Sequence, residues 1–221
     1  MRLLLTFAMM ACALGADVDP AAIVRRSILN DESESTGPAL HYTLTERSRT
    51  RNLDDRGQLR SAASRTREIK MPDFQKRRER YRKAIREIPD AFVFRLLGEE
   101  EVNSRPAYVI EATPRPGYDP VDRYSKLFTQ LRAKLWIDKS DYQWAKVEAE
   151  LLDTVTFGWI LVRIHKGSRV RLTQELVGHE VWLPREMWYR VSLRIGLVSL
   201  RNVEVETEYG GYRRSDADPA P

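Results

Sequence analysis

The sequence has 221 residues, a formal net charge of +5 at pH 7 and 42% hydrophobic residues, which is the composition of a globular protein with one substantial domain. Its one cysteine, Cys12, lies in the first segment, so the rest of the chain must fold without disulfide bonds. The three histidines, His41, His165 and His179, have no further ligand at zinc spacing, so no zinc motif is present. After the N-terminus, no apolar run reaches the roughly 18 residues expected of a membrane helix.

The N-terminus predicts an export signal. Arg2 is followed by a short apolar run and then by small residues, so we expect residues 1–16 to be a signal peptide cleaved near Ala16. The residues from Met9 to Cys12 loosely resemble a bacterial lipoprotein signal, which leaves a lipid anchor at Cys12 as the alternative. Either route predicts the cell envelope, and we favour the periplasm.

Residues 17–38 predict a short helix and a linker ahead of one sheet domain. Asp19-Pro20 starts the helix, and Ile23, Val24 and Ile28 share one side of it. The linker, residues 32–38, is rich in Ser, Glu, Gly and Pro. A single domain over residues 39–214 and a disordered tail over residues 215–221 complete the chain.

Apolar and polar residues alternate with period two over most of that domain, which predicts antiparallel strands joined by short turns. Asp54 to Gly57 and Asn103-Ser104 carry the residues of tight turns. The second strand is so polar that we place it at the edge of the sheet. The predicted strands cover residues 40–51, 58–71, 91–101, 107–112, 133–138, 143–152, 154–166, 169–178, 180–183, 187–195 and 203–209.

The last two strands predict their own register. A turn centred near Ser199 would place Leu193 opposite Val205, Arg194 opposite Glu204 and Arg190 opposite Glu208, which requires a loop with an odd number of residues.

Two helical segments interrupt the strands. Residues 74–88 have apolar residues at helical spacing and basic residues elsewhere, which predicts an amphipathic basic helix ended by Pro89-Asp90. A second amphipathic helix begins at about Asp122, after a proline-rich loop. Both are expected to cover the sheet. Contact with an anionic membrane surface or headgroup is the hypothesis for Lys76, Arg77, Arg80 and Lys83.

The sequence offers no catalytic group with its partners. No Ser sits in a glycine-flanked elbow, and the mature chain has no Cys nucleophile unless Cys12 is retained. Asp138 and Asp153 could form the carboxylate pair of a hydrolase, but both follow strands directly, where turn residues are usual. We therefore expect a protein that is not an enzyme and has no cofactor.

A half-open sheet must cover its apolar face, and the covering helices can leave a groove there. Strand parity and helix position suggest the side chains that would line such a groove. The predicted lining is Tyr42, Phe92, Phe94, Tyr108, Phe128, Leu131, Trp136, Phe157, Trp159, Trp182, Tyr189 and Val191.

Several short runs are characteristic: residues 108–112, Pro114-Arg115-Pro116-Gly117-Tyr118, Leu135-Trp136-Ile137-Asp138, Lys166-Gly167-Ser168, Val181-Trp182-Leu183-Pro184 and residues 209–212. Together they resemble bacterial outer-membrane lipoprotein-sorting proteins, which are related in fold to the LolA-type carrier, the LolB-type acceptor and the RseB-type sensor. The likeness covers most of residues 40–214. It departs from that family in a short connection before Phe74 and in Ser104, which replaces a turn glycine.

The resemblance implies a mainly β fold with some helix (α+β), in which helices cover the concave face of a curved antiparallel half-barrel. It also implies a periplasmic carrier of lipid or lipoprotein acyl chains. The alternative is an envelope-stress sensor or scaffold that binds a protein partner, and an envelope hydrolase is third. We expect a monomer with no nucleic-acid partner.

Overall fold

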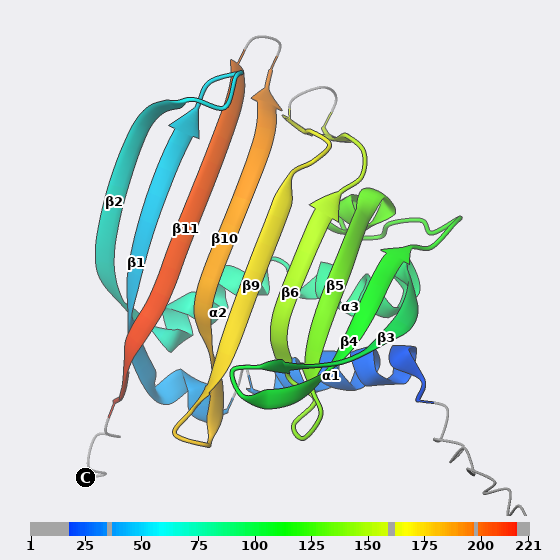
Figure 1. Cartoon of the computed structure of the whole chain (residues 1–221), viewed down its shortest axis with the longest axis vertical. Helices are drawn as coiled ribbons and strands as arrows, with labels where there is room; N and C mark the ends of the chain where they lie inside the picture. Colours follow the sequence, from blue (N-terminus) through cyan, green and yellow to red (C-terminus); the bar gives the residue numbers. More distant parts are fainter. Residues whose placement is uncertain (1–17, 35–36, 159–161, 197–198, 216–221) are drawn as a thin grey trace, which may run out of the picture.

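A computed structural model describes residues 18–34, 37–158, 162–196 and 199–215 (Figure 1). The predicted signal peptide and most of the predicted tail lie outside these ranges. The described helices are α1 (Pro20–Glu34), α2 (Met71–Glu79) and α3 (Arg82–Ala91), with 3-10 turns η1 (Pro38–His41) and η2 (Ser125–Gln130). The described strands are β1 (Tyr42–Leu53), β2 (Leu59–Lys70), β3 (Phe92–Val102), β4 (Arg105–Pro114), β5 (Leu131–Asp138), β6 (Trp144–Leu151), β7 (Val155–Phe157), β8 (Val162–Ile164), β9 (Arg169–Val177), β10 (Val181–Ile195) and β11 (Ser199–Arg214).

All these strands belong to one antiparallel sheet that does not close into a barrel. Its order is β2-β1-β11-β10-β9-β6-β5-β4-β3, and the β7–β8 hairpin joins β10 (Figure 1). Most neighbours are consecutive in the sequence, but β1 pairs with β11 from the opposite end of the chain. The polar strand β2 is an edge strand, as predicted. The fold class is therefore confirmed: a curved, open antiparallel sheet with few helices.

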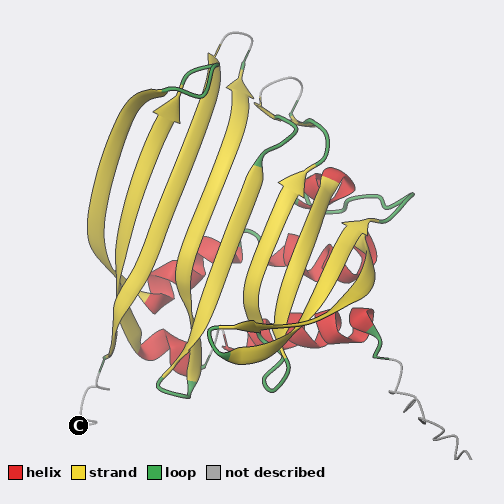
Figure 2. Ribbon diagram, in the orientation of Figure 1, coloured by secondary structure: helices red, strands yellow, loops and turns green. Residues whose placement is uncertain are grey.

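The helices lie on one face of the sheet, which we call the inner face (Figure 2). Ile23, Val24 and Ile28 of α1 are buried against Ile110 and Leu135, and α3 adds Ile85 and Ile88 to the same cluster. A second cluster joins α2 to the same face of the sheet near β1 and β2, through Met71 of α2 and Leu44 of β1. The apolar positions of α1 are the ones that the sequence assigned to one side of that helix.

The strand register arranges the inner face in rows of facing side chains. One row, from β3 to β2, is Phe94, Ala112, Ala133, Ala149, Val170, Tyr189, Val205, Thr50 and Ala63. The next is Leu96, Ile110, Leu135, Val147, Leu172, Met187, Thr207, Ser48 and Arg65. The second row is apolar over β3 to β10 and becomes polar at β11, β1 and β2, whereas the first row is polar only at Thr50 of β1.

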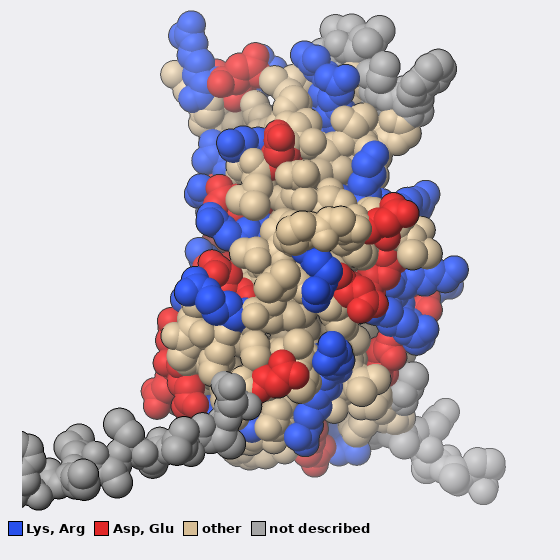
Figure 3. Space-filling view, turned by 90° about the vertical axis from the view of Figure 1, so that its right-hand side faces the viewer, with Lys and Arg blue, Asp and Glu red and all other residues tan. Residues whose placement is uncertain are grey.

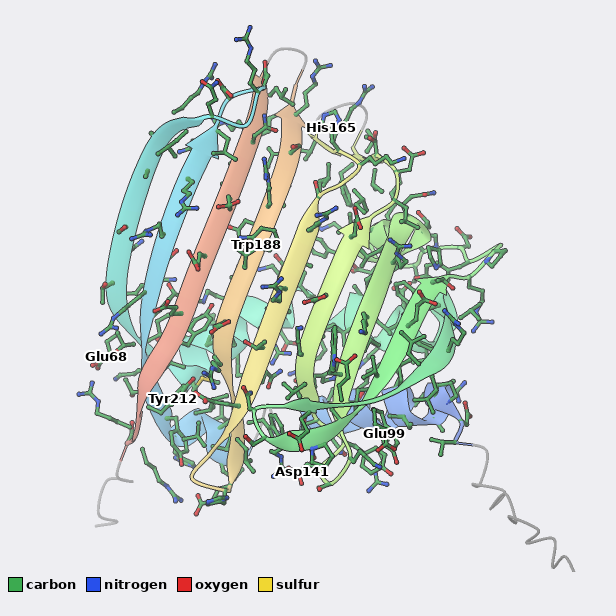
Figure 4. The ribbon with its side chains drawn as sticks, in the orientation of Figure 1. Glu68, Glu99, Asp141, His165, Trp188 and Tyr212 are labelled. Atoms are coloured by element: carbon green, nitrogen blue, oxygen red, sulfur yellow. The ribbon has the colours of Figure 1, made fainter. Side chains whose placement is uncertain are left out.

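The opposite, outer face is charged. The row between those two is Arg95, Glu111, Lys134, Glu148, Arg171, Trp188, Glu206, Arg49 and Ser64. Acidic and basic side chains alternate along it, interrupted by Trp188, which Figure 4 shows in front of the strands. Acidic and basic groups are also interspersed on the side of the molecule that carries β3 (Figure 3). Such a face is suited to water, because neighbouring charges neutralise one another.

Three predicted elements are divided differently in the structure. The basic helix predicted over residues 74–88 is two helices, because the chain turns at Tyr81, whose ring packs edge-on against Tyr124 at 4.9 Å. Pro89 does not end the helix but lies in the last turn of α3. The segment from Asp122 forms the 3-10 turn η2 in place of a longer helix.

Two predictions about strands also need correction. Residues 154–166 are not one strand, because Gly158 has a φ of +57° and β7 ends just before it. Residues 180–183 and 187–195 form the single strand β10, which passes Pro184 through a bulge.

The predicted register of the last hairpin is wrong by four residues. Leu193 faces Arg201, and Arg190 faces Glu204. The loop is odd, as predicted, because Ile195 pairs with Ser199. The glutamates of β11 are balanced chiefly by β1, where Arg47, Arg49 and Arg51 lie opposite Glu208, Glu206 and Glu204. The sequence argument predicted the strand over residues 40–51 but missed its pairing with β11, since pairing between distant segments leaves no local pattern.

Candidate functional site

The helices cover only part of the inner face. Figure 1 shows α1, α2 and α3 behind one half of the sheet, while β1, β2, β10 and β11 continue well beyond them. Inner-face side chains on this extension are apolar and incompletely buried. We call them the apolar strip: Leu172, Tyr189, Val191, Leu193 and Val203. Leu172 is 40% exposed although it lies in the middle of the sheet.

The β7–β8 hairpin extends this strip. Ile164 faces both Leu193 and Val155, so these side chains share the inner face. Phe157 and Ile195 both face Val162 in the next register position, and Ile195 is 46% exposed. Neighbouring apolar side chains that remain exposed on one face make this surface a candidate for contact with a ligand or partner.

Charged cavities adjoin the strip on its β2 side. One of about 320 Å³ is lined by Glu46, Ser48, Thr50, Ala63, Ser64, Arg65 and Arg67. Another of about 510 Å³ lies between β2 and α2 and is lined by Arg67, Glu68, Ile69, Asp73, Lys76, Arg77 and Arg80. Arg67 is common to the two. Across a few neighbouring strands, the inner-face side chains therefore change from apolar groups to hydroxyl groups and then to guanidinium groups.

The predicted lining residues separate into three sets. Phe92, Phe94, Tyr108, Phe128 and Leu131 belong to the core under α1, α3 and η2, and Tyr42 belongs to the cluster beside α2. Phe157, Tyr189 and Val191 lie on the incompletely covered inner face. Trp159 is outside the described residues. Trp136 and Trp182 lie elsewhere, so the structure does not bring the predicted lining together.

Trp136 is on the outer face. It packs with Ala107 and Val109, and its Nε1 donates a hydrogen bond to Glu100 Oε2 at 2.7 Å. The reason is strand parity, because its neighbours Leu135 and Ile137 both enter the inner core. That alternation was visible in the sequence and would have placed Trp136 correctly.

Trp182 is 5% exposed and lies at the end of the sheet. Its Nε1 donates to Asp141 Oδ2 at 3.0 Å, and the Arg105 guanidinium stands 5.5 Å from its ring. These contacts make it part of a polar cluster rather than of the apolar strip.

The predicted basic residues are partly brought together. Lys76, Arg77 and Arg80 line the 510 Å³ cavity, whereas Lys83 follows in α3 and is not among its lining residues. Arg65 and Arg67 of the edge strand β2 turn toward the same region. The strand register is needed to place them there.

The hydrolase hypothesis finds no support in the placement of its carboxylates. Leu131 pairs with Leu151 and Ile137 with Trp144, so Asp138 and Asp153 lie at opposite ends of β5 and β6, about 20 Å apart. Asp138 is fully buried, and Arg105 binds both its oxygens at 2.7 and 2.9 Å. Its role is structural.

Within the described part of the chain, no group of three or more His, Cys, Asp or Glu side chains could hold a metal ion. No described helix has the length and apolar character needed to cross a membrane.

No family model matches the sequence, and no curated protein matches it either. The chain is similar in fold to solved structures of LolA-superfamily and outer-membrane lipoprotein-sorting proteins, which is the likeness that the sequence motifs implied. One is a lipoprotein-sorting protein domain from Vibrio parahaemolyticus, with a TM-score of 0.37 and 11% identity over 89% of this chain and 95% of that chain. A LolA superfamily protein from Nitrosomonas europaea has a TM-score of 0.34 and 14% identity, over 91% and 96% of the two chains. A chain of the Pseudomonas aeruginosa MucA/MucB complex has a TM-score of 0.31 and 11% identity, over 90% and 100%.

Proposed function

We propose that the protein is a non-enzymatic periplasmic carrier or binder that holds acyl chains of a lipid or lipoprotein against its apolar strip. The observation that carries the proposal is the exposure of Leu172, which is flanked on the same inner row by Val147 and Met187. An exposed leucine between apolar neighbours on the face that elsewhere packs the core is a place where hydrocarbon can be added.

Hydrocarbon burial alone supplies enough free energy for such binding. Each buried CH₂ group contributes about 0.8 kcal/mol, so ten carbons contribute roughly 8 kcal/mol before the cost of association is subtracted. The binding free energy that remains after this cost is modest, which suits a carrier, because a carrier must also release its cargo.

The proposal includes the cellular setting that the sequence predicts. Residues 1–16 are proposed to direct export and then to be removed, leaving a single sheet domain over residues 39–214 that acts as a monomer. Exposed basic residues at α2, including Lys76 within the helix and Arg80 just after its end, would meet the anionic membrane surface while the cargo is exchanged.

The test places a charge in the strip. Leu172→Asp is expected to weaken binding of a dansyl-labelled fatty acid at least about 10-fold, because a carboxylate must be dehydrated when hydrocarbon covers it. Fluorescence titration measures the affinity. Leu172 is partly exposed, so the variant should keep the wild-type circular dichroism spectrum.

Val93→Asp is the matched control. Val93 is 46% exposed on β3 and alternates with Phe94, so it faces outward. This variant should bind the probe as the wild type does. Equal affinity of Leu172→Asp and wild type, or no binding by the wild type, would overturn the proposal.

A further inference from the structure

We propose that the cavity between β2 and α2 is a phosphate-binding site, so that the preferred ligand is a phosphorylated amphiphile with its acyl chains on the apolar strip. The inference rests on the proposed function and deepens it by naming the polar group of the cargo. It concerns the cluster of Arg67, Lys76, Arg77 and Arg80, which we call the basic cluster.

The strand register connects the strip to the basic cluster. Val205 on β11 faces Thr50 on β1, and Thr50 faces Ala63 on β2. One row further along the strands, Thr207 and Ser48 lead to Arg65, and in the row after that Tyr209 and Glu46 lead to Arg67. Neighbouring strands are about 4.8 Å apart and successive residues rise about 3.3 Å, so Arg67 on β2 lies roughly 20 Å from Leu172 and Tyr189 of the strip. That distance fits one amphiphilic molecule.

Cations predominate in the cavity. The four residues of the basic cluster line it together with two acidic residues, Glu68 and Asp73. Glu68, at the β2 edge of the sheet in Figure 4, already pairs with Arg213. The cavity therefore has an excess of positive charge that is not balanced by its own carboxylates.

Arg77 has an unused donor at this place. Its Nη2 atom is buried and forms no hydrogen bond, and the nearest carboxylate oxygen, Glu46 Oε2, is 3.8 Å away. Glu46 is 6% exposed, and its other oxygen accepts a 2.6 Å hydrogen bond from Arg67 Nε. A buried donor without an acceptor costs about 1 to 3 kcal/mol, and a ligand oxygen would remove that cost.

The aromatic neighbours fix the position of the guanidinium group. Phe74 lies 5.5 Å from the Arg77 guanidinium and packs edge-on against Tyr209 at 5.8 Å. Burial raises the pKa of Tyr209 to about 12, so its hydroxyl group remains neutral beside the cations. Positioned guanidinium groups bind phosphate through paired hydrogen bonds, which a single point charge does not provide.

The experiment compares two amphiphiles with the same chain, dodecyl phosphate and dodecyl maltoside, and inorganic phosphate as a third probe. Isothermal titration calorimetry below the micelle concentration should show at least about 10-fold tighter binding of dodecyl phosphate by the wild type. The double variant Arg77→Gln/Arg80→Gln should lose this preference and bind dodecyl maltoside unchanged.

A control variant removes the same charge elsewhere. Arg95→Gln/Arg132→Gln changes two outer-face arginines, and it should keep the preference for dodecyl phosphate. If this control loses the preference as well, long-range charge and not a site explains the binding, and the inference fails.

The probes separate the two proposals. Equal binding of both amphiphiles by the wild type would overturn the phosphate site and leave the acyl-chain function standing. Failure to bind either amphiphile would overturn the proposed function itself. Inorganic phosphate bound as tightly as dodecyl phosphate would identify free phosphate as the ligand and overturn the amphiphile assignment.

Discussion

At the residue scale, Asp138 anchors the end of the sheet. Its carboxylate is fully buried and accepts hydrogen bonds from Arg105 and from the backbone amides of Ser140 and Asp141. Burial alone would raise the pKa of Asp138, but these hydrogen bonds outweigh it and lower the pKa below the usual 3.8. The ionised form is therefore the one that stabilises the fold.

Asp138→Asn is expected to lower the free energy of unfolding by about 3 kcal/mol at pH 7, measured by urea denaturation. A group with a lowered folded pKa contributes stability above its unfolded pKa and loses it as the pH falls through the folded value. The difference between variant and wild type should therefore shrink below about pH 4. The exposed Asp153→Asn should change stability by less than about 0.5 kcal/mol. An undiminished difference at pH 2 would contradict this account.

At the scale of the element, the β3–β4 hairpin contains a strained turn. Asn103 and Ser104 have φ values of +50° and +61°, as a two-residue turn between these strands requires. Glycine adopts a positive φ easily, but the side chain of Ser104 disfavours it. A left-handed conformation costs a residue with a side chain about 1 to 2 kcal/mol. The hairpin tip compensates by bonding to the sheet, where Asn103 Nδ2 donates to the Gln174 carbonyl.

Ser104→Gly should raise the free energy of unfolding by about 0.5 to 1 kcal/mol, because relief of strain exceeds the added entropy of the unfolded chain. Urea denaturation measures the change. Ser140→Gly is the matched control: Ser140 lies in the β5–β6 turn with a negative φ, so glycine there should be neutral or destabilising. A lower stability for Ser104→Gly would show that Ser104 makes a contact worth more than its strain.

The elements that the sequence predicted well are those with local signals. The Asp54 turn has Gly57 at a φ of +79°, and Asp54 Oδ1 accepts hydrogen bonds from the amides of Arg56 and Gln58. No local signal marks the helix break at Tyr81, whose ring contacts Tyr124, 43 residues further along the chain. Distant contacts override helical periodicity.

At the scale of the whole molecule, the outer face depends on its carboxylates. Burial would raise the pKa of Glu148, but Lys146 and Arg171 lower it below the usual 4.5. Each exposed pair contributes only about 0 to 1 kcal/mol, but the rows join many of them. When the pH falls below the lowered pKa values, the glutamates are protonated, and the arginine and lysine side chains of the rows lose their counterions.

The urea midpoint is therefore expected to fall as the pH is lowered from 5 to 3. Carboxylates whose pKa is lower in the folded than in the unfolded state stabilise the fold above the unfolded pKa, and this stabilisation is lost as the pH falls through the folded pKa. Added NaCl should slightly lower the midpoint at pH 7, where it screens attraction, and raise it at pH 3, where it screens repulsion. A midpoint at pH 3 equal to that at pH 7 would show that the charged rows contribute nothing to stability.

The candidate site was harder to predict than the fold. Alternation along the sequence placed Tyr189 and Val191 on one face, but Leu172 and Val203 were overlooked because their exposure depends on how far the helices reach. The basic cluster combines Arg67 from β2 with Arg77 from α2, and only the folded chain shows that both line one cavity. A run of charged residues in a sequence indicates that the segment is at the surface of the protein. The pairing of the strands determines which of these charged side chains lie next to one another.

The pairing of β1 with β11 also determines the order in which the sheet can assemble. The sheet lacks the pairing of β1 with β11 until residues 199–214 have been synthesised, so β1 and β2, which come first in the chain, must wait for β11. The topology thus delays final assembly of the sheet until β11 is available.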